Sequence, residues 1–146
     1  MNRLIIVVGI FILIVIAAAV LILVPGPNTA NAPTEMVGSL PDLITVTSPL
    51  PQKKITSPLL ITGKARGNWY FEASAPFQLK DAAGKVIAQG HVDAQGDWMT
   101  TDFVPFMAST TFPAQPEGSI GALILMNDNP SGDPAKQKEL NIPVVF

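Results

Sequence analysis

Carboxylates are the side chains of this 146-residue chain that come closest to a catalytic pattern. Glu72 lies in the aromatic stretch WYFEASAPFQLK, and Asp97 and Asp102 follow it along the chain. A glycoside hydrolase needs two such carboxyl groups about 5–10 Å apart in a cleft. A small β-domain has little room for such a cleft, so a cell-wall hydrolase is an alternative and not the leading hypothesis.

The single histidine, His91, lacks the partners that a metal centre or a catalytic triad requires. The chain has no cysteine and only one histidine, and a protein zinc site is built mainly from these two residue types. No G-x-S-x-G motif is present to supply a nucleophilic serine. The alternation of its segment places His91 on an exposed face. We therefore expect no catalytic role for His91 and no zinc site.

The run NDNPSG resembles the beginning of a calcium-binding loop. Asn127, Asn129, Ser131 and Gly132 match positions 1, 3, 5 and 6 of an EF-hand loop. The twelfth position is Lys138, where a bidentate glutamate is required, and a proline interrupts the run. A β-turn between two strands explains these residue types better. The sequence therefore predicts no metal ion and no cofactor.

The elements that position these side chains follow from a hydrophobic period of two. From Asp42 onward apolar and polar residues alternate in short segments, which is typical of strands with one buried face. In the stretch 69–80 this alternation puts Tyr70 and Glu72 on the polar face, and Pro76 predicts a bulge or break. Turns are expected at 81–84 and 93–97, and each copy of TSPL is expected to mark a strand boundary. The predicted strands lie within 43–47, 59–65, 69–80, 86–92, 106–112, 122–126 and 140–146.

About seven or eight short strands, with turn residues every 8–12 positions or so, predict an all-β fold of the immunoglobulin-like β-sandwich class over residues 42–146. Because the chain has no cysteine, no disulfide can stabilise this domain, and its stability must come from the core. We expect Trp69 and Trp98 to be largely buried in that core.

An N-terminal transmembrane helix is predicted before this domain, because Leu4–Val24 contains no charged residue. At about 1.5 Å per residue this segment makes a helix of about 31 Å, enough to cross the hydrocarbon core. Arg3 precedes it, so positive charge holds residues 1–3 in the cytoplasm and directs the rest outward. Residues 25–41 are proline-rich and predict a semi-stiff tether. The expected location is therefore the cell membrane, with a single pass and an extracytoplasmic C-terminal domain.

Cleavage of the N-terminal segment is the alternative to an anchor. Ala30-Asn31-Ala32 matches a signal-peptidase site, so cleavage after Ala32 is the alternative. The apolar run is longer than a signal peptide requires, and Pro33 would follow the cut, so we expect an uncleaved anchor. Acidic residues outnumber basic ones, 11 to 9, which argues against a nucleic-acid partner.

Several ordered blocks of the sequence are more specific than a generic strand pattern. They are SPLLITGKARGNWYFEAS (57–74), DAAGKV (81–86), QGDWM (95–99), FVPF (103–106), NDNPSG (127–132) and IPVVF (142–146). Over residues of about 44–146 these blocks resemble the family of immunoglobulin-like domains of bacterial spore germination. This resemblance implies an immunoglobulin-like β-sandwich on a bacterial envelope protein and implies no catalytic residue. Glu72 lies inside one block, where it could pair with Arg66 or Lys64 across a neighbouring strand.

The leading functional hypothesis is a membrane-anchored domain that acts as a binding or scaffolding module of the cell envelope. Such domains bind through their end loops or by adding a strand at a sheet edge. The expected partners are the membrane and an envelope protein or polysaccharide, and we expect no enzymatic activity. The alternatives are a small cell-wall hydrolase that uses Glu72 with Asp97 or Asp102, and a purely structural envelope spacer. Convergent carboxylates in a pocket would favour the hydrolase, and a flat apolar patch on a sheet edge or an end loop would favour binding.

Overall fold

The computed structural model describes residues 39–40 and 42–146, which belong to one compact unit. The predicted membrane helix and the rest of the tether lie outside the described residues. In the part that is described, no helix has the length and apolar character needed to span a membrane. The strands are β1 (Ser39–Leu40), β2 (Ile44–Ser48), β3 (Leu59–Arg66), β4 (Ser74–Lys80), β5 (Val86–Ala94), β6 (Phe103–Thr110), β7 (Ile120–Met126) and β8 (Glu139–Val145), with short 3-10 helices η1 (Gly67–Trp69) and η2 (Pro134–Lys136).

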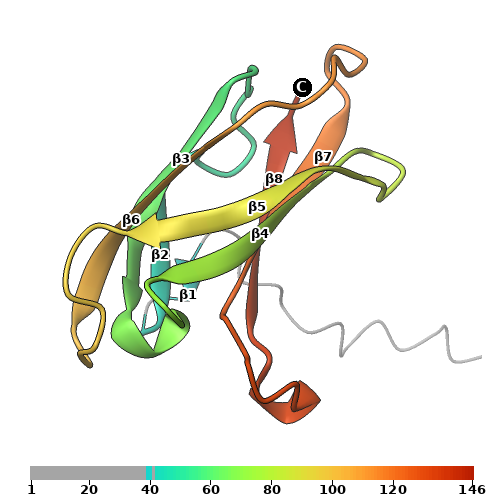
Figure 1. Cartoon of the computed structure of the whole chain (residues 1–146). Helices are drawn as coiled ribbons and strands as arrows, with labels where there is room; N and C mark the ends of the chain where they lie inside the picture. The colour runs from blue at the N-terminus through green and yellow to red at the C-terminus, as the bar shows by residue number, and fades with distance from the viewer. Residues whose placement is uncertain (1–38, 41) are drawn as a thin grey trace, which may run out of the picture. The chain divides into compact units, whose positions relative to one another are not determined.

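The strands pair antiparallel in the order β1-β2-β3-β6-β5-β4-β7-β8 (Figure 1). Only two residue pairs join β5 to β6, and this narrow connection divides the sheet into two layers. One layer contains β2, β3 and β6, and the other contains β4, β7 and β8 with β5 along its side. These two sets correspond to the A-B-E and C-F-G strands of an immunoglobulin fold. The prediction of an all-β, immunoglobulin-like fold is therefore confirmed.

The outer edge of β8 is covered by the segment 52–55. The Gln52 N–H donates to the Pro143 carbonyl at 2.7 Å, and the Ile55 N–H donates to the Val145 carbonyl at 2.8 Å. The Val145 N–H in turn donates to the Lys53 carbonyl at 3.1 Å. Main-chain groups that are already paired cannot accept an added strand. This part of the β8 edge is therefore not available for strand addition.

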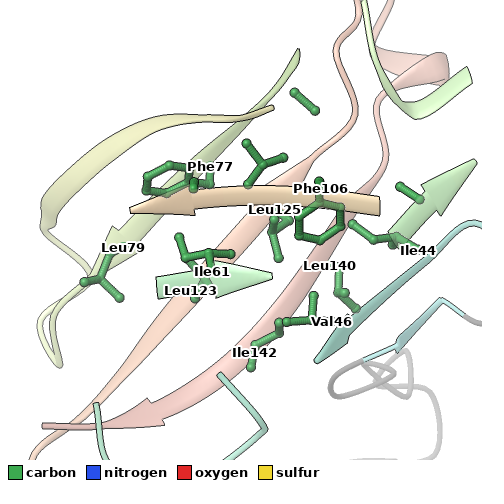
Figure 2. Packing of buried hydrophobic residues seen from close by; sticks show 14 of the residues in the cluster. Ile44, Val46, Ile61, Phe77, Leu79, Phe106, Leu123, Leu125, Leu140 and Ile142 are labelled. Carbon is green, nitrogen blue, oxygen red and sulfur yellow. The ribbon is translucent and has the colours of Figure 1, made fainter. Parts of the chain in front are cut away.

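The core lies between the two layers and is built by alternate residues of their strands (Figure 2). The predicted inward face of 140–146 is confirmed, since every second residue there is at most 5% exposed. The predicted face of 106–112 is confirmed for Phe106 and Ala108, whereas Thr110 and Phe112 are only partly buried. Burial of these side chains drives the layers together, at about 25 cal/mol for each Å² of apolar surface removed from water. The labelled core residues in Figure 2 are Ile44, Val46, Ile61, Phe77, Leu79, Phe106, Leu123, Leu125, Leu140 and Ile142.

Two predicted boundaries are confirmed. The 81–84 turn closes with the Gly84 N–H donating to the Asp81 carbonyl at 3.0 Å. Gly84 has a φ of +79°, a conformation that glycine adopts without a steric penalty. The two TSPL copies lie where β2 ends, at Ser48, and where β3 begins, at Leu59.

In the stretch 69–80 a strand begins only at Ser74, although the alternation predicted a strand from Trp69 onward. The main chains of Phe71 and Ser74 exchange two hydrogen bonds, of 3.0 and 3.1 Å, around a two-residue turn. The turn residues Glu72 and Ala73 have φ of +50° and +62°. Two positive φ values in a tight hairpin turn indicate type I′. Glu72 is therefore exposed, as expected, but it lies at the tip of a turn and not on the face of a strand.

The predicted break at Pro76 is also wrong, because Pro76 lies within β4, opposite His91 of β5. On its other side β4 pairs with β7 only from Phe77 to Lys80. Pro76 therefore lies beyond the end of that pairing, where its missing N–H removes no bond to β7.

We expect Ala73→Gly to stabilise the domain by about 0.5–1 kcal/mol. A left-handed conformation costs a non-glycine residue roughly 1–2 kcal/mol, and glycine removes this cost. The greater flexibility of glycine in the unfolded chain offsets about half of the stabilisation. Urea midpoints of the variant and the parent measure the difference. Ala83→Gly is the matched control in the next turn along the chain, at the other end of β4. Ala83 has no positive φ, so its replacement by glycine should not stabilise the domain. Equal midpoints for Ala73→Gly and the parent would show that the turn is not strained.

Candidate functional site

Three segments gather at one end of the sandwich, at the bottom of the view in Figure 1, and we call this surface the loop end. They are η1, the β5–β6 loop (95–102) and the β7–β8 loop (127–138). The Gly67 N–H donates to the Asp102 carbonyl at 3.1 Å, and the Asp128 N–H donates to the Trp69 carbonyl at 2.9 Å. Helix η1 therefore connects the two loops through main-chain bonds.

The β5–β6 loop is fixed by its own short-range hydrogen bonds. The Asp97 carboxylate accepts from the Met99 N–H at 3.0 Å, and the Thr100 N–H donates to the Trp98 carbonyl at 2.8 Å. The Thr100 hydroxyl accepts from the Asp102 N–H at 3.1 Å. Because these bonds fix the backbone, the side chains at the tip are presented in a defined arrangement.

Arg66 attaches the same loop to the rest of the sheet. Its Nη1 donates to the Thr101 carbonyl at 3.2 Å, and its Nε donates to the Asp42 carbonyl at 3.2 Å. The guanidinium lies 4.1 Å from the centroid of the Phe103 ring, and the Lys64 ammonium lies 5.1 Å from it. Both distances are in the range of cation–π contacts. Among the ion pairs of the described residues none joins Glu72 to Arg66 or Lys64, so the predicted pairing is wrong.

The tip of the β5–β6 loop exposes apolar side chains. Met99 is 78% exposed, and Trp98 is only partly buried. The prediction of burial is thus confirmed for Trp69, which is 2% exposed, but Trp98 lies on a loop and contacts the core from its border. Trp98 and Met99, together with Tyr70, line a shallow hollow of about 440 Å³. Its polar part comes from the hydrogen-bonding side chains of Asn68, Thr100 and Thr101.

A second hollow, of about 260 Å³, lies beside the first and shares Asn68 with it. Trp69 and Asn127 line it together with Lys136 and Lys138 of the β7–β8 loop. Asn127 fixes this loop, because its Oδ1 accepts from the Lys138 N–H at 2.6 Å and its Nδ2 donates to the Lys136 carbonyl at 3.2 Å. We call this second cavity the lysine hollow. Neither hollow was foreseen from the sequence, because residues from distant segments combine to form them.

The carboxylates singled out in the sequence are only partly brought together. Asp97 and Asp102 line one shallow hollow of about 330 Å³ beside the β5–β6 loop, and Glu72 is not among its lining residues. Within the described residues, no group of three His, Asp or Glu side chains is arranged to hold a metal ion. His91 is exposed on β5, as predicted. The structure therefore places Glu72 apart from the hollow that the two aspartates share.

The 127–133 run forms a turn, as predicted from its residue types. The Gly132 N–H donates to the Asn129 carbonyl at 3.0 Å, and Gly132 has a φ of +64°. The Ser131 hydroxyl donates to Asn129 Oδ1 at 2.7 Å, and Asn129 Nδ2 donates to the Asp133 carbonyl at 2.8 Å. These side chains are therefore engaged in holding the loop that lines the lysine hollow.

Tyr70 lies beneath the loop end and is 4% exposed, although its alternation predicted a polar face. Its hydroxyl donates to the Val104 carbonyl at 2.8 Å. Burial raises the pKa of Tyr70 from 10.0 to about 12, and a main-chain hydrogen bond from Ala65 opposes this rise. The buried hydroxyl therefore holds β6 against the residues that follow η1.

Tyr70 is the one tyrosine of the chain, so tyrosinate absorbance reports it alone. We expect an apparent pKa of about 12 in the folded protein and about 10 in denaturant. The unfolded state releases the proton first, so stability should fall as the pH rises from about 10 towards about 12. A folded-state titration centred near the denatured value would show that the hydroxyl is accessible to water.

The fold and the loop end define a small immunoglobulin-like domain that presents an apolar loop tip and three shallow hollows at one end. The chain belongs to the family described as the immunoglobulin-like domain of bacterial spore germination, whose model matches residues 43–133. The matched region includes the β5–β6 loop and the beginning of the β7–β8 loop. Comparisons with curated proteins and with solved structures find no significant match.

Proposed function

We propose that this protein is a membrane-anchored binding module of the bacterial cell envelope, which presents its loop end outside the cytoplasm. The family supports a bacterial immunoglobulin-like domain. The apolar segment Leu4–Val24 supports the anchor, and Arg3 before it supports the orientation. The partner is an envelope protein or polysaccharide.

The observation that carries the binding role is the exposure of Met99 on a loop whose backbone is already fixed. A loop with a defined conformation loses little entropy on binding, so a contact with its tip contributes more fully to affinity. Methionine adapts its shape to a contacting surface, and Trp98 beside it offers a large aromatic area. A purely structural spacer would not require this exposed apolar tip.

Site-specific photo-crosslinking in intact host cells tests this role with the full chain. A photoreactive amino acid in place of Met99 should give discrete adducts with an envelope component. The same amino acid in place of Ala83, in an exposed turn at the opposite end of the strands, is the matched control. Adducts at 99 but not at 83 support a binding loop end. Absence of adducts at both positions, or equal adducts at both, would overturn it.

The anchor is tested separately by fractionation of cells that express the full chain. We expect the protein to stay with membranes after a carbonate wash, because the segment Leu4–Val24 favours insertion strongly. Mass spectrometry should find the N-terminal segment still attached. A mature protein that begins at Pro33 would show that the segment is a cleaved signal peptide and that the domain is released from the membrane.

A further inference from the structure

Trp69, which lines the lysine hollow, carries a buried hydrogen-bond donor that has no acceptor. Trp69 lines this hollow and is 2% exposed. Its indole Nε1 is the one buried side-chain polar atom without a hydrogen-bond partner among the described residues. A buried N–H that has lost its water and gained no acceptor costs free energy. A residue that lines the lysine hollow is therefore short of a hydrogen-bond acceptor.

The charged side chains that line the lysine hollow are both cationic. Lys136 approaches the Asp133 carboxylate only to 3.9 Å, and the other oxygen of that carboxylate accepts from the Ala135 N–H at 3.0 Å. None of the ion pairs seen in residues 39–146 involves Lys138. Other acids of the adjoining segments are Asp42, Asp128 and Glu139, and none of them lines the hollow.

We propose that the lysine hollow binds the carboxylate of an acidic saccharide, whose ring lies against Trp98 in the neighbouring hollow. This proposal deepens the proposed function, on which it rests, by naming the ligand class of the loop end. A carboxylate supplies the negative charge that Lys136 and Lys138 attract. Because Trp69 Nε1 is itself buried, the proposed contact runs through a bridging water, which accepts from Nε1 and donates to the carboxylate.

We infer that the ligand is a saccharide from the residues that line the neighbouring hollow. An aromatic face, such as that of Trp98, packs against the C–H groups of a sugar ring. Thr100 and Thr101 carry hydroxyl groups, and Asn68 an amide, that can bond to sugar hydroxyls. Asn68 lines both hollows, so a ligand that spans them passes this residue. One acidic sugar unit therefore engages both hollows.

Nuclear magnetic resonance of the two indole N–H groups tests the proposal on the full chain in detergent micelles. The chain has two tryptophans, and a Trp98→Phe variant assigns their resonances. The probes are sodium D-glucuronate, D-glucose as the neutral ring, and acetate as the carboxylate without a ring. Glucuronate should shift both indole resonances in a saturable way, with weak affinity in the millimolar range that is usual for so small a contact. Acetate should shift Trp69 more weakly, and glucose should shift only Trp98.

Charge variants identify the lysines as the source of affinity. The double variant Lys136→Gln and Lys138→Gln should weaken glucuronate binding tenfold or more. The matched control is Lys53→Gln with Lys85→Gln, which removes two exposed lysines at the opposite end of the strands. This control should bind glucuronate as the parent does. Equal weakening in both double variants would show a general charge effect and overturn the assignment.

Three other results would overturn the proposal. They are an unchanged Trp69 resonance at saturating glucuronate, a response to acetate as strong as that to glucuronate, and equal responses to glucose and glucuronate. The proposed function fails by a different measurement. If crosslinking at position 99 succeeds while glucuronate shifts neither indole, the loop end binds another ligand class and only the saccharide assignment is lost.

Discussion

Replacing Trp69 by alanine is expected to lower the free energy of unfolding by about 3–5 kcal/mol. The Trp69 side chain is 2% exposed and belongs to the main core cluster. Its removal leaves a cavity that the surrounding strands, fixed by main-chain hydrogen bonds, cannot collapse to fill. A loss of this size is a large fraction of the roughly 5–15 kcal/mol by which a domain is stable. Urea denaturation of the compact unit Glu35–Phe146, followed by circular dichroism, measures it.

Trp98→Ala is the matched control, because it removes the same side chain from a partly buried position. Its expected cost is smaller, about 1–2 kcal/mol, since part of the side chain is already exposed in the folded protein. Trp69→Phe should recover part of the stability by filling most of the cavity. Equal losses for the two alanine variants would contradict the different burial of the two tryptophans.

The layers of this fold were predictable because burial imposes a strict period of two on a strand with one apolar face. In β8, Leu140, Ile142 and Val144 alternate with less apolar or more exposed neighbours, and the structure buries all three. The same rule failed at 69–73, where alternation continues through a 3-10 helix and a turn. The turn residues are Glu72 and Ala73, and neither belongs to the glycine and asparagine types that identify such a turn in a sequence.

The candidate site was harder to predict, because long-range contacts assemble it. The sequence drew attention to Glu72, whose side chain is exposed at a turn. Met99 and Asn68 were not singled out, because one isolated methionine or asparagine belongs to no recognisable sequence motif. The lysine hollow combines η1 with a loop almost 60 residues further along the chain. A periodic pattern describes neighbours along one element, and so it carries no information about such pairs of segments.

Gly67→Ala is expected to destabilise the domain by about 2–3 kcal/mol, near the upper part of the range for overpacking. A Cβ on Gly67 would overlap the main-chain carbonyl oxygens of Trp98 and Thr100. These atoms belong to backbone that hydrogen bonds hold in place, so the loop cannot move aside at low cost. The same displacement would stretch the 3.1 Å bond from the Gly67 N–H to the Asp102 carbonyl. Urea midpoints measure the loss of stability. Trp98 fluorescence in a Trp69→Phe background reports whether the environment of the β5–β6 loop has changed.

Gly96→Ala is the matched control within the same loop. A Cβ there would meet only a Val104 methyl group at 3.9 Å, which is an ordinary contact. Gly96 has no positive φ, so alanine fits its backbone and should leave stability unchanged or raise it by up to about 1 kcal/mol. Because Gly67 supports the loop from below, its alanine variant should also weaken crosslinking at position 99, whereas Gly96→Ala should not. If Gly67→Ala were as stable as Gly96→Ala, the β5–β6 loop would be able to move aside at low cost. That result would contradict the fixed loop backbone on which the proposed binding role rests.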